Sequence, residues 1–169
     1  MCYDIIKNGI GGNQAVERYM ELNAEEKLLE DAANMAFELL YINDKYLIDK
    51  RVSERSIVFR YAHYLQSELE KTNKYRGYNL DCEYNRDGSD LKHIYESDHG
   101  VFPDLIIHKR GSNKNNLLII EFKTYWNNDI TNDERKIREF ININGRFKYK
   151  YGFSVVFNRD YPKVYRITY

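Results

Sequence analysis

The sequence predicts an α/β sandwich in which helices pack on a mixed sheet. Two amphipathic helical patterns come first, three strand-like segments follow them, and a third helical pattern precedes two closing strands. The chain has 169 residues and contains no Pro-rich or Gly/Ser-rich linker, so a single core is expected. We expect one domain over 23–169, preceded by a peripheral N-terminal segment over 1–22.

The first helix has a recognisable start. Asn23 can cap it, and Glu26 stands three residues later, as in a capping box. Its end is expected near 41–44. Apolar residues recur along it at helical spacing: Leu28, Leu29, Ala32, Met35, Leu39 and Leu40.

A second helix is expected from Ser53 to about Lys71. Val52 and Ile57 occupy the two positions of a hydrophobic staple around its start. An apolar stripe then continues along one face of the helix through Val58, Tyr61, Ala62, Leu65 and Leu69.

Three strands are expected after the second helix, over 78–85, 101–108 and 117–124. The third of these segments is an almost continuous apolar run, which predicts burial on both faces. The polar stretch 109–116 is typical of a hairpin connection, so the last two strands are expected to pair.

The final part of the chain predicts a helix and two closing strands. Thr131 and Glu134 form another capping box, and Gly145 is a suitable helix terminator. The closing strands are expected over 147–157 and 163–168. The inner face of the helix is expected to consist of Ile137, Phe140 and Ile141.

Three charged residues stand where the predicted hairpin brings two strand ends together. Asp104 lies at the start of one strand, and Glu121 and Lys123 lie at the end of the next. Side chains alternate along a strand, so Glu121 and Lys123 share one face of the sheet. Antiparallel pairing would place Asp104 beside both of them. We therefore expect two carboxylates and an ammonium group at one end of the sheet.

This set of residues suits the hydrolysis of phosphodiester bonds. Two carboxylates bind a hard cation such as Mg²⁺, with Mn²⁺ as an alternative, and the cation polarises a phosphate and activates water. Lys123 can orient the attacking water and stabilise the charge that develops on phosphorus oxygens. A structural alternative is a pair of strand-end salt bridges. The apolar residues that flank the trio argue against an exposed edge.

At these residues the sequence resembles the PD-(D/E)xK nuclease superfamily. The segment FPDLIIH, around Asp104, matches its PD half, and IIEFK, around Glu121, matches its ExK half. The resemblance implies a restriction-endonuclease-like three-layer sandwich with a mixed central sheet flanked by helices. It also implies Mg²⁺-dependent hydrolysis of nucleic acid, DNA in the first instance or RNA. Asp104, Glu121 and the Phe122 carbonyl would bind the metal, and Lys123 would be the catalytic lysine.

A third carboxylate is expected near this trio, and two residues compete for the role. Glu54 precedes the apolar stripe of the second helix and should point toward the sheet, as family members with a helix glutamate imply. Its alternative role is to complement the helix macrodipole. Glu83 lies in the first strand, in a row with Asp81 and Asn85 that can face solvent.

Further residues are candidates for contacts with nucleic acid. Tyr125 and Trp126 follow the lysine and can stack on a base, although rim packing is the structural alternative. Arg135, Lys136 and Arg138 lie on the helix after the site and can contact phosphates, or can form a solvated face.

Two histidines are expected to take no part, His63 because it is buried and His108 because it lies far from Asp104.

The composition limits the partners and the setting. Lys and Arg number 26, as do Asp and Glu, so nucleic acid has to be attracted by a local patch. Cys2 and Cys82 form neither a metal spacing nor a disulfide framework, which favours a cytoplasmic setting. No apolar run reaches the roughly 18 residues of a membrane span, and we expect no membrane partner. A homodimer would double the surface available to a duplex.

Two alternatives to an active nuclease remain open from the sequence. The first is a catalytically inactive protein of the same fold that binds nucleic acid or a partner protein, which the neutral net charge favours. The second is a different fold with coincidental motif residues, and the order of the strands distinguishes it.

Overall fold

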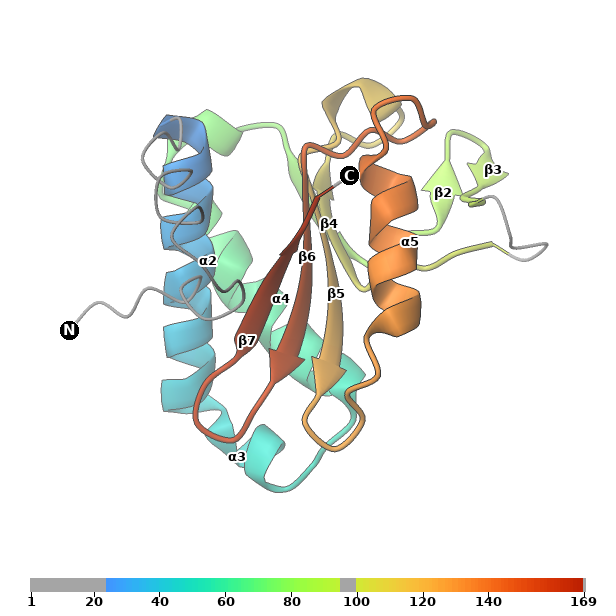
Figure 1. Cartoon of the computed structure of the whole chain (residues 1–169). Coiled ribbons are helices and arrows are strands. Elements are labelled where there is room, and N and C mark those ends of the chain that lie inside the picture. Colours follow the sequence, from blue (N-terminus) through green and yellow to red (C-terminus); the bar gives the residue numbers. More distant parts are fainter. Residues whose placement is uncertain (1–23, 95–99, 169) are drawn as a thin grey trace, which may run out of the picture.

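The computed structural model describes residues 24–94 and 100–168 (Figure 1). The predicted peripheral segment 1–22 and the capping residue Asn23 lie outside these residues. In chain order the elements are α2 (Ala24–Asn43), α3 (Lys45–Asp49), α4 (Glu54–Glu70), η2 (Asn73–Tyr75), β1 (Asn79–Cys82), β2 (Arg86–Asp87), β3 (Asp90–Leu91), β4 (Leu105–His108), η3 (Asn113–Asn115), β5 (Leu118–Thr124), α5 (Thr131–Ile141), β6 (Tyr151–Phe157) and β7 (Lys163–Ile167).

A five-stranded mixed sheet forms the centre of the molecule, with the strand order β1-β4-β5-β6-β7. Strand β5 pairs in parallel with β6, and the other neighbours are antiparallel. The predicted hairpin of β4 and β5 is confirmed, with Leu105 opposite Ile120. The crossover from β5 to the parallel strand β6 contains α5, as expected for a parallel connection.

Helices cover both faces of this sheet. Figure 1 shows α2 and α4 on one face and α5 on the other. The side chains of Leu118, Ile120 and Phe122 pack on the first side, and Ile119 packs beneath α5. The α/β class and the mixed sheet are therefore confirmed. The arrangement is compatible with a three-layer sandwich.

The apolar stripe of α4 is buried as predicted, but the buried face of α2 differs from the prediction. Leu28 and Met35 are 43% and 41% exposed, whereas Ala36 and Phe37 are buried. Ala36 allows α2 to approach α4 closely, and the Phe37 ring stacks on Tyr61 at 4.3 Å between centroids. The burial of His63 was a wrong prediction, because this residue lies on the exposed side of α4.

Helix α5 has the predicted inner face but not the predicted cap. Ile137, Phe140 and Ile141 are buried. Thr131 is the first helical residue rather than the cap, and its backbone N–H donates to Asp129 Oδ1 at 3.0 Å. The side chain of Asp129 thus satisfies a free N–H group at the start of the helix.

A partly buried cluster of Asp81, His108 and Arg110 ties β1 to the end of β4. His108 Nε2 lies 2.9 Å from Asp81 Oδ2, and Arg110 Nε donates to the same oxygen at 2.8 Å. Burial alone would raise the pKa of Asp81, but the hydrogen bonds and charges of Arg110 and His108 lower it well below its usual value. His108 is thus engaged in structure, away from Asp104.

Replacing Asp81 with asparagine is expected to lower the free energy of unfolding at pH 7 by about 1–2 kcal/mol, because Arg110 and His108 lose a charged acceptor. The folded-state pKa lies below the unfolded value of about 3.9, so the contribution is present above that value and is lost as pH falls through the folded pKa. Urea unfolding of wild type and variant at neutral and acid pH measures this contribution of Asp81 to the free energy of unfolding. A difference between variant and wild type that grows toward acid pH would contradict this assignment.

No helix within 24–94 and 100–168 is both long enough and apolar enough to cross a membrane.

Candidate active site

Asp104 lies beside the end of β5, as the hairpin predicts. It immediately precedes β4, and the Phe122 backbone N–H donates to Asp104 Oδ2 at 2.7 Å. This hydrogen bond extends the ladder between β4 and β5 beyond Leu105. Its acceptor is the Asp104 carboxylate rather than a backbone carbonyl. Its effect is to fix the Asp104 carboxylate next to Glu121 and Lys123.

Glu121 is the most deeply buried carboxylate of the site, with 2% of its surface exposed. Lys136 on α5 donates to Glu121 Oε2 at 2.8 Å and to the Phe102 carbonyl at 2.7 Å. The other oxygen, Oε1, is buried without a hydrogen-bond partner among the described residues. A buried acceptor without a partner is unfavourable by about 1–3 kcal/mol, and more when it is charged. This oxygen therefore needs a proton or a cation.

Lys123 is held between carboxylates of two helices. Its Nζ lies 2.9 Å from Asp133 Oδ2 on α5 and 3.9 Å from Glu54 Oε1 on α4. The same ammonium donates to the Phe122 carbonyl at 3.2 Å. Lys123 thus connects both helical layers at the end of the sheet.

Of the two competing glutamates, Glu54 is the one that faces Lys123. Its Oε2 atom is buried without a partner among the described residues. Glu83 instead pairs with Arg55 at 2.6 Å, and its side chain is 41% exposed. Both glutamates line a cleft that also contacts Asp104. Glu54 is the less exposed of the two, with 29% of its side-chain surface accessible.

The site carries more negative than positive charge. Four carboxylates, Glu54, Asp104, Glu121 and Asp133, surround the ammonium groups of Lys123 and Lys136. Burial raises the pKa of Glu121 to about 8, and the charge of Asp104 adds to the rise. Burial also raises the pKa of Glu54 to about 7, against the opposing charge of Lys123, and raises that of Asp104. With all groups ionised, two negative charges remain uncompensated.

A hard divalent cation fits these donors. Asp104, Glu121 and the Phe122 carbonyl supply oxygen atoms, which such ions prefer. The Glu121 Oε1 atom has no hydrogen-bond partner among the described residues, so it is available to such an ion. Within the described residues, no three His, Cys, Asp or Glu side chains form a metal-ligand group. A metal ion here would have two carboxylates and a backbone carbonyl as its protein ligands.

Sequence reasoning missed one member of the site and gave another a different role. No sequence motif indicates Asp133, although it lies four residues before the buried Ile137 and so shares the inner face of α5. Lys136 was predicted to contact phosphate. The structure places it on Glu121, and a phosphate contact by Lys136 stays a prediction.

The other nucleic-acid candidates lie around the site without joining it. The rings of Tyr125 and Trp126 contact each other edge to face at 4.8 Å, and Arg51 donates to the Tyr125 hydroxyl at 3.3 Å. Arg135 and Arg138 are exposed on α5, and Arg138 donates to the Thr168 carbonyl. Their contacts with nucleic acid stay predictions.

No family model, curated protein or solved structure matches this chain. The resemblance to the PD-(D/E)xK superfamily therefore rests on two short motifs and on the order of helices and strands. Because one fold can host many functions, the function has to be inferred from the chemistry of the site.

Proposed function

We propose that this protein is a metal-dependent nuclease of the restriction-endonuclease-like class. The observation that carries the proposal is the meeting of Asp104, Glu121 and Lys123 at one end of the β4–β5 hairpin, with the Glu121 Oε1 atom buried and without a partner. The two motifs and the helix that joins β5 to β6 support the same class. The reaction would be hydrolysis of phosphodiester bonds in DNA or RNA, in a cytoplasmic setting.

Asp104, Glu121 and the Phe122 carbonyl would hold the metal. Bound Mg²⁺ or Mn²⁺ would supply a Lewis acid for the phosphate and lower the pKa of a water molecule. Lys123 would stabilise the charge that develops on the phosphate oxygens. Asp133 holds Lys123 in place, and Lys136 fixes the orientation of Glu121 through Oε2. These two residues of α5 are positioning residues.

One observation favours a second candidate function, a catalytically inactive nuclease fold that binds nucleic acid or a partner protein. Lys136 already occupies one oxygen of Glu121, and Lys123 is paired with Asp133. The site is thus partly neutralised from within the chain. Binding without cleavage would identify this function. A homodimer stays an expectation for either function.

The purified protein is expected to cleave nucleic acid in the presence of Mg²⁺ or Mn²⁺ and to lose this activity when EDTA is added, because the cation would supply the Lewis acid and lower the pKa of the attacking water. Single- and double-stranded DNA and RNA form the substrate panel. Asp104→Ala is expected to abolish cleavage. Gel electrophoresis of end-labelled substrates measures the result.

An exposed acidic residue provides the control. Glu38→Ala removes a carboxylate on the surface of α2 and is expected to leave cleavage unchanged. Cleavage that continues in EDTA, or that is equal in Asp104→Ala and wild type, would disprove the assignment. Metal binding with no cleavage of any substrate would favour the inactive fold.

A further inference from the structure

The cleft beside Asp104 is built by the start of α4 and the end of β1. Glu54, Arg55 and Phe59 line it from the helix, and Cys82, Glu83 and Asp104 line the other side. Because Asp104 forms part of its wall, a molecule that enters this site cleft reaches the candidate active site.

An exposed aromatic ring forms one wall of the site cleft. Phe59 is 65% exposed, while its neighbour Val58 is buried and anchors α4 to the core. The Phe59 ring is therefore not needed for packing. A nucleic-acid base can stack on such a ring, which is worth about 1–3 kcal/mol per base. Only a base outside the stack of a duplex presents its face in this way.

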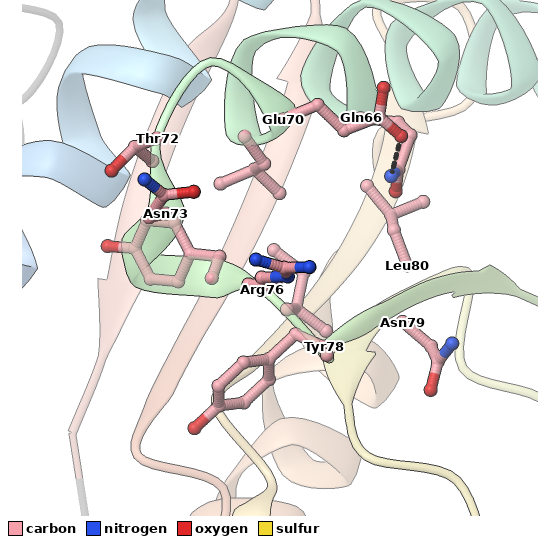
Figure 2. A pocket seen from close by; sticks show the side chains of 12 residues that line it. Gln66, Glu70, Thr72, Asn73, Arg76, Tyr78, Asn79 and Leu80 are labelled. Carbon is pink, nitrogen blue, oxygen red and sulfur yellow. Dashed lines mark hydrogen bonds between the residues drawn. The ribbon is translucent and has the colours of Figure 1, made fainter.

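A second pocket lies at the other end of the same helix and strand (Figure 2). We call it the far pocket. Gln66 and Glu70 line it from the last turns of α4, and Arg76, Tyr78 and Leu80 line it from the chain that leads into β1. Figure 2 shows the Arg76 side chain in the middle of this pocket, between the helix and the strand.

The Arg76 guanidinium makes no ion pair or side-chain hydrogen bond within the described residues, so its five donors are available to a ligand. The single carboxylate of the far pocket, Glu70, already accepts a hydrogen bond from Gln66 at 2.5 Å. A guanidinium recognises phosphate through two parallel hydrogen bonds. The far pocket thus suits a backbone phosphate.

The two pockets are separated by a distance that suits a short nucleic-acid strand. On α4 the lining of the site cleft extends to Phe59 and that of the far pocket starts at Gln66, seven residues or about 10 Å further along the helix axis. Proteins that bind single strands contact about 4–16 nucleotides per site. One strand of several nucleotides can therefore reach from the site cleft to the far pocket.

We propose that the substrate strand is single-stranded nucleic acid that lies along α4 and β1, with a base stacked on Phe59 and a phosphate bound by Arg76. This inference rests on the proposed function, which makes nucleic acid the ligand. Single-stranded DNA and RNA share the chemistry that these two residues recognise, and a duplex does not expose the base faces.

Binding of fluorescent oligonucleotides of about 20 nucleotides, longer than the expected site, tests the inference by anisotropy. The full chain is used with Lys123→Met as background in Mg²⁺, and gels check that the oligonucleotides stay intact. Oligo(dT), oligo(U) and a DNA duplex are compared. Phe59→Ala and Arg76→Ala are expected to weaken single-strand binding by about 5- to 150-fold. Phe59→Trp is expected to retain it.

Two further measurements separate the roles of the residues. Arg76→Ala is expected to reduce the slope of log affinity against log salt by about 0.7, because one phosphate contact is lost, whereas Phe59→Ala leaves the slope unchanged. Ile42→Ala on α2 and Arg86→Ala on β2 replace exposed residues outside both pockets and are expected to bind like the parent protein. Thermal melts confirm that all variants fold.

Tighter binding of the duplex, no binding of either single strand, or unchanged affinity in Phe59→Ala and Arg76→Ala would each overturn the inference. If wild type cleaves nucleic acid while these variants bind normally, the proposed function stands and the single-strand path fails. If the variants lose affinity but wild type cleaves nothing with any metal, the binding path stands and the nuclease assignment fails.

Discussion

Lys123→Met is expected to cleave nucleic acid about 10²–10³-fold more slowly than wild type, the usual effect of removing one group that stabilises transition-state charge. Its affinity for Mn²⁺ is expected to be retained or increased, because the lost ammonium repels a cation. Glu121→Gln is expected to lose both cleavage and metal affinity, because it removes a negatively charged ligand. Single-turnover rates and isothermal titration calorimetry measure the two quantities separately.

The comparison of these variants distinguishes a catalytic lysine from a structural one. Lys163→Met replaces an exposed lysine in the edge strand β7, in the same cross-strand row as Lys123 but two strands away, and is expected to cleave at the wild-type rate. If Lys123→Met also cleaves at that rate, Lys123 is only a counterion for Asp133 and Glu54. If it loses metal affinity as Glu121→Gln does, its role is to shape the metal site.

The centre of the site could be predicted from sequence because it depends on local rules. A polar connection between two apolar strands fixes a hairpin, and alternation along β5 fixes the faces of Glu121 and Lys123. The strand boundaries were less accurate. Strand β4 begins at Leu105 rather than near residue 101, because Pro103 has no N–H to donate to the ladder. Asp104 therefore contacts β5 through its side chain, which accepts a hydrogen bond from the Phe122 backbone N–H.

The buried face of α2 depends on contacts that the sequence does not specify. Leu28 and Leu29 are equally apolar, but only Leu29 packs on the core. The packing of α2 on α4 through Ala36 and Phe37 decides which side is buried. Helical periodicity identifies an amphipathic helix, but here it could not decide between two overlapping apolar stripes.

The roles of Asp133 and Lys136 could not be predicted because they depend on how closely α5 approaches the sheet. Both residues extend from α5 to β5. The sequence spacing of residues 121, 123, 133 and 136 does not determine the distance between this helix and the sheet. A glycine in β6 determines this distance, because it allows α5 to pack close to the sheet. Gly152 pairs with Ile119 and lies beneath Ile137 and Ile141 of α5.

Gly152→Ala is expected to lower the free energy of unfolding by about 1–3 kcal/mol, and Gly152→Val by more. A Cβ atom at this position would lie 2.4 Å from Ile137 Cγ2 and 2.9 Å from Ile141 Cγ2. The branched isoleucine side chains cannot rotate away freely, so α5 has to move outward. For a chain of this size, the loss corresponds to a melting temperature lower by about 2–4 °C per kcal/mol.

Movement of α5 would also act on the site, because it carries Asp133 away from Lys123 and Lys136 away from Glu121. We therefore expect Gly152→Ala to cleave more slowly than wild type at a temperature where both are folded. Ser154→Ala is the matched control on the same face of β6: its hydroxyl is buried without a partner among the described residues, so its removal is expected to be neutral or stabilising. Equal melting temperatures for Gly152→Ala and wild type would show that α5 does not rest on Gly152, and the positions of Asp133 and Lys136 would then need another cause.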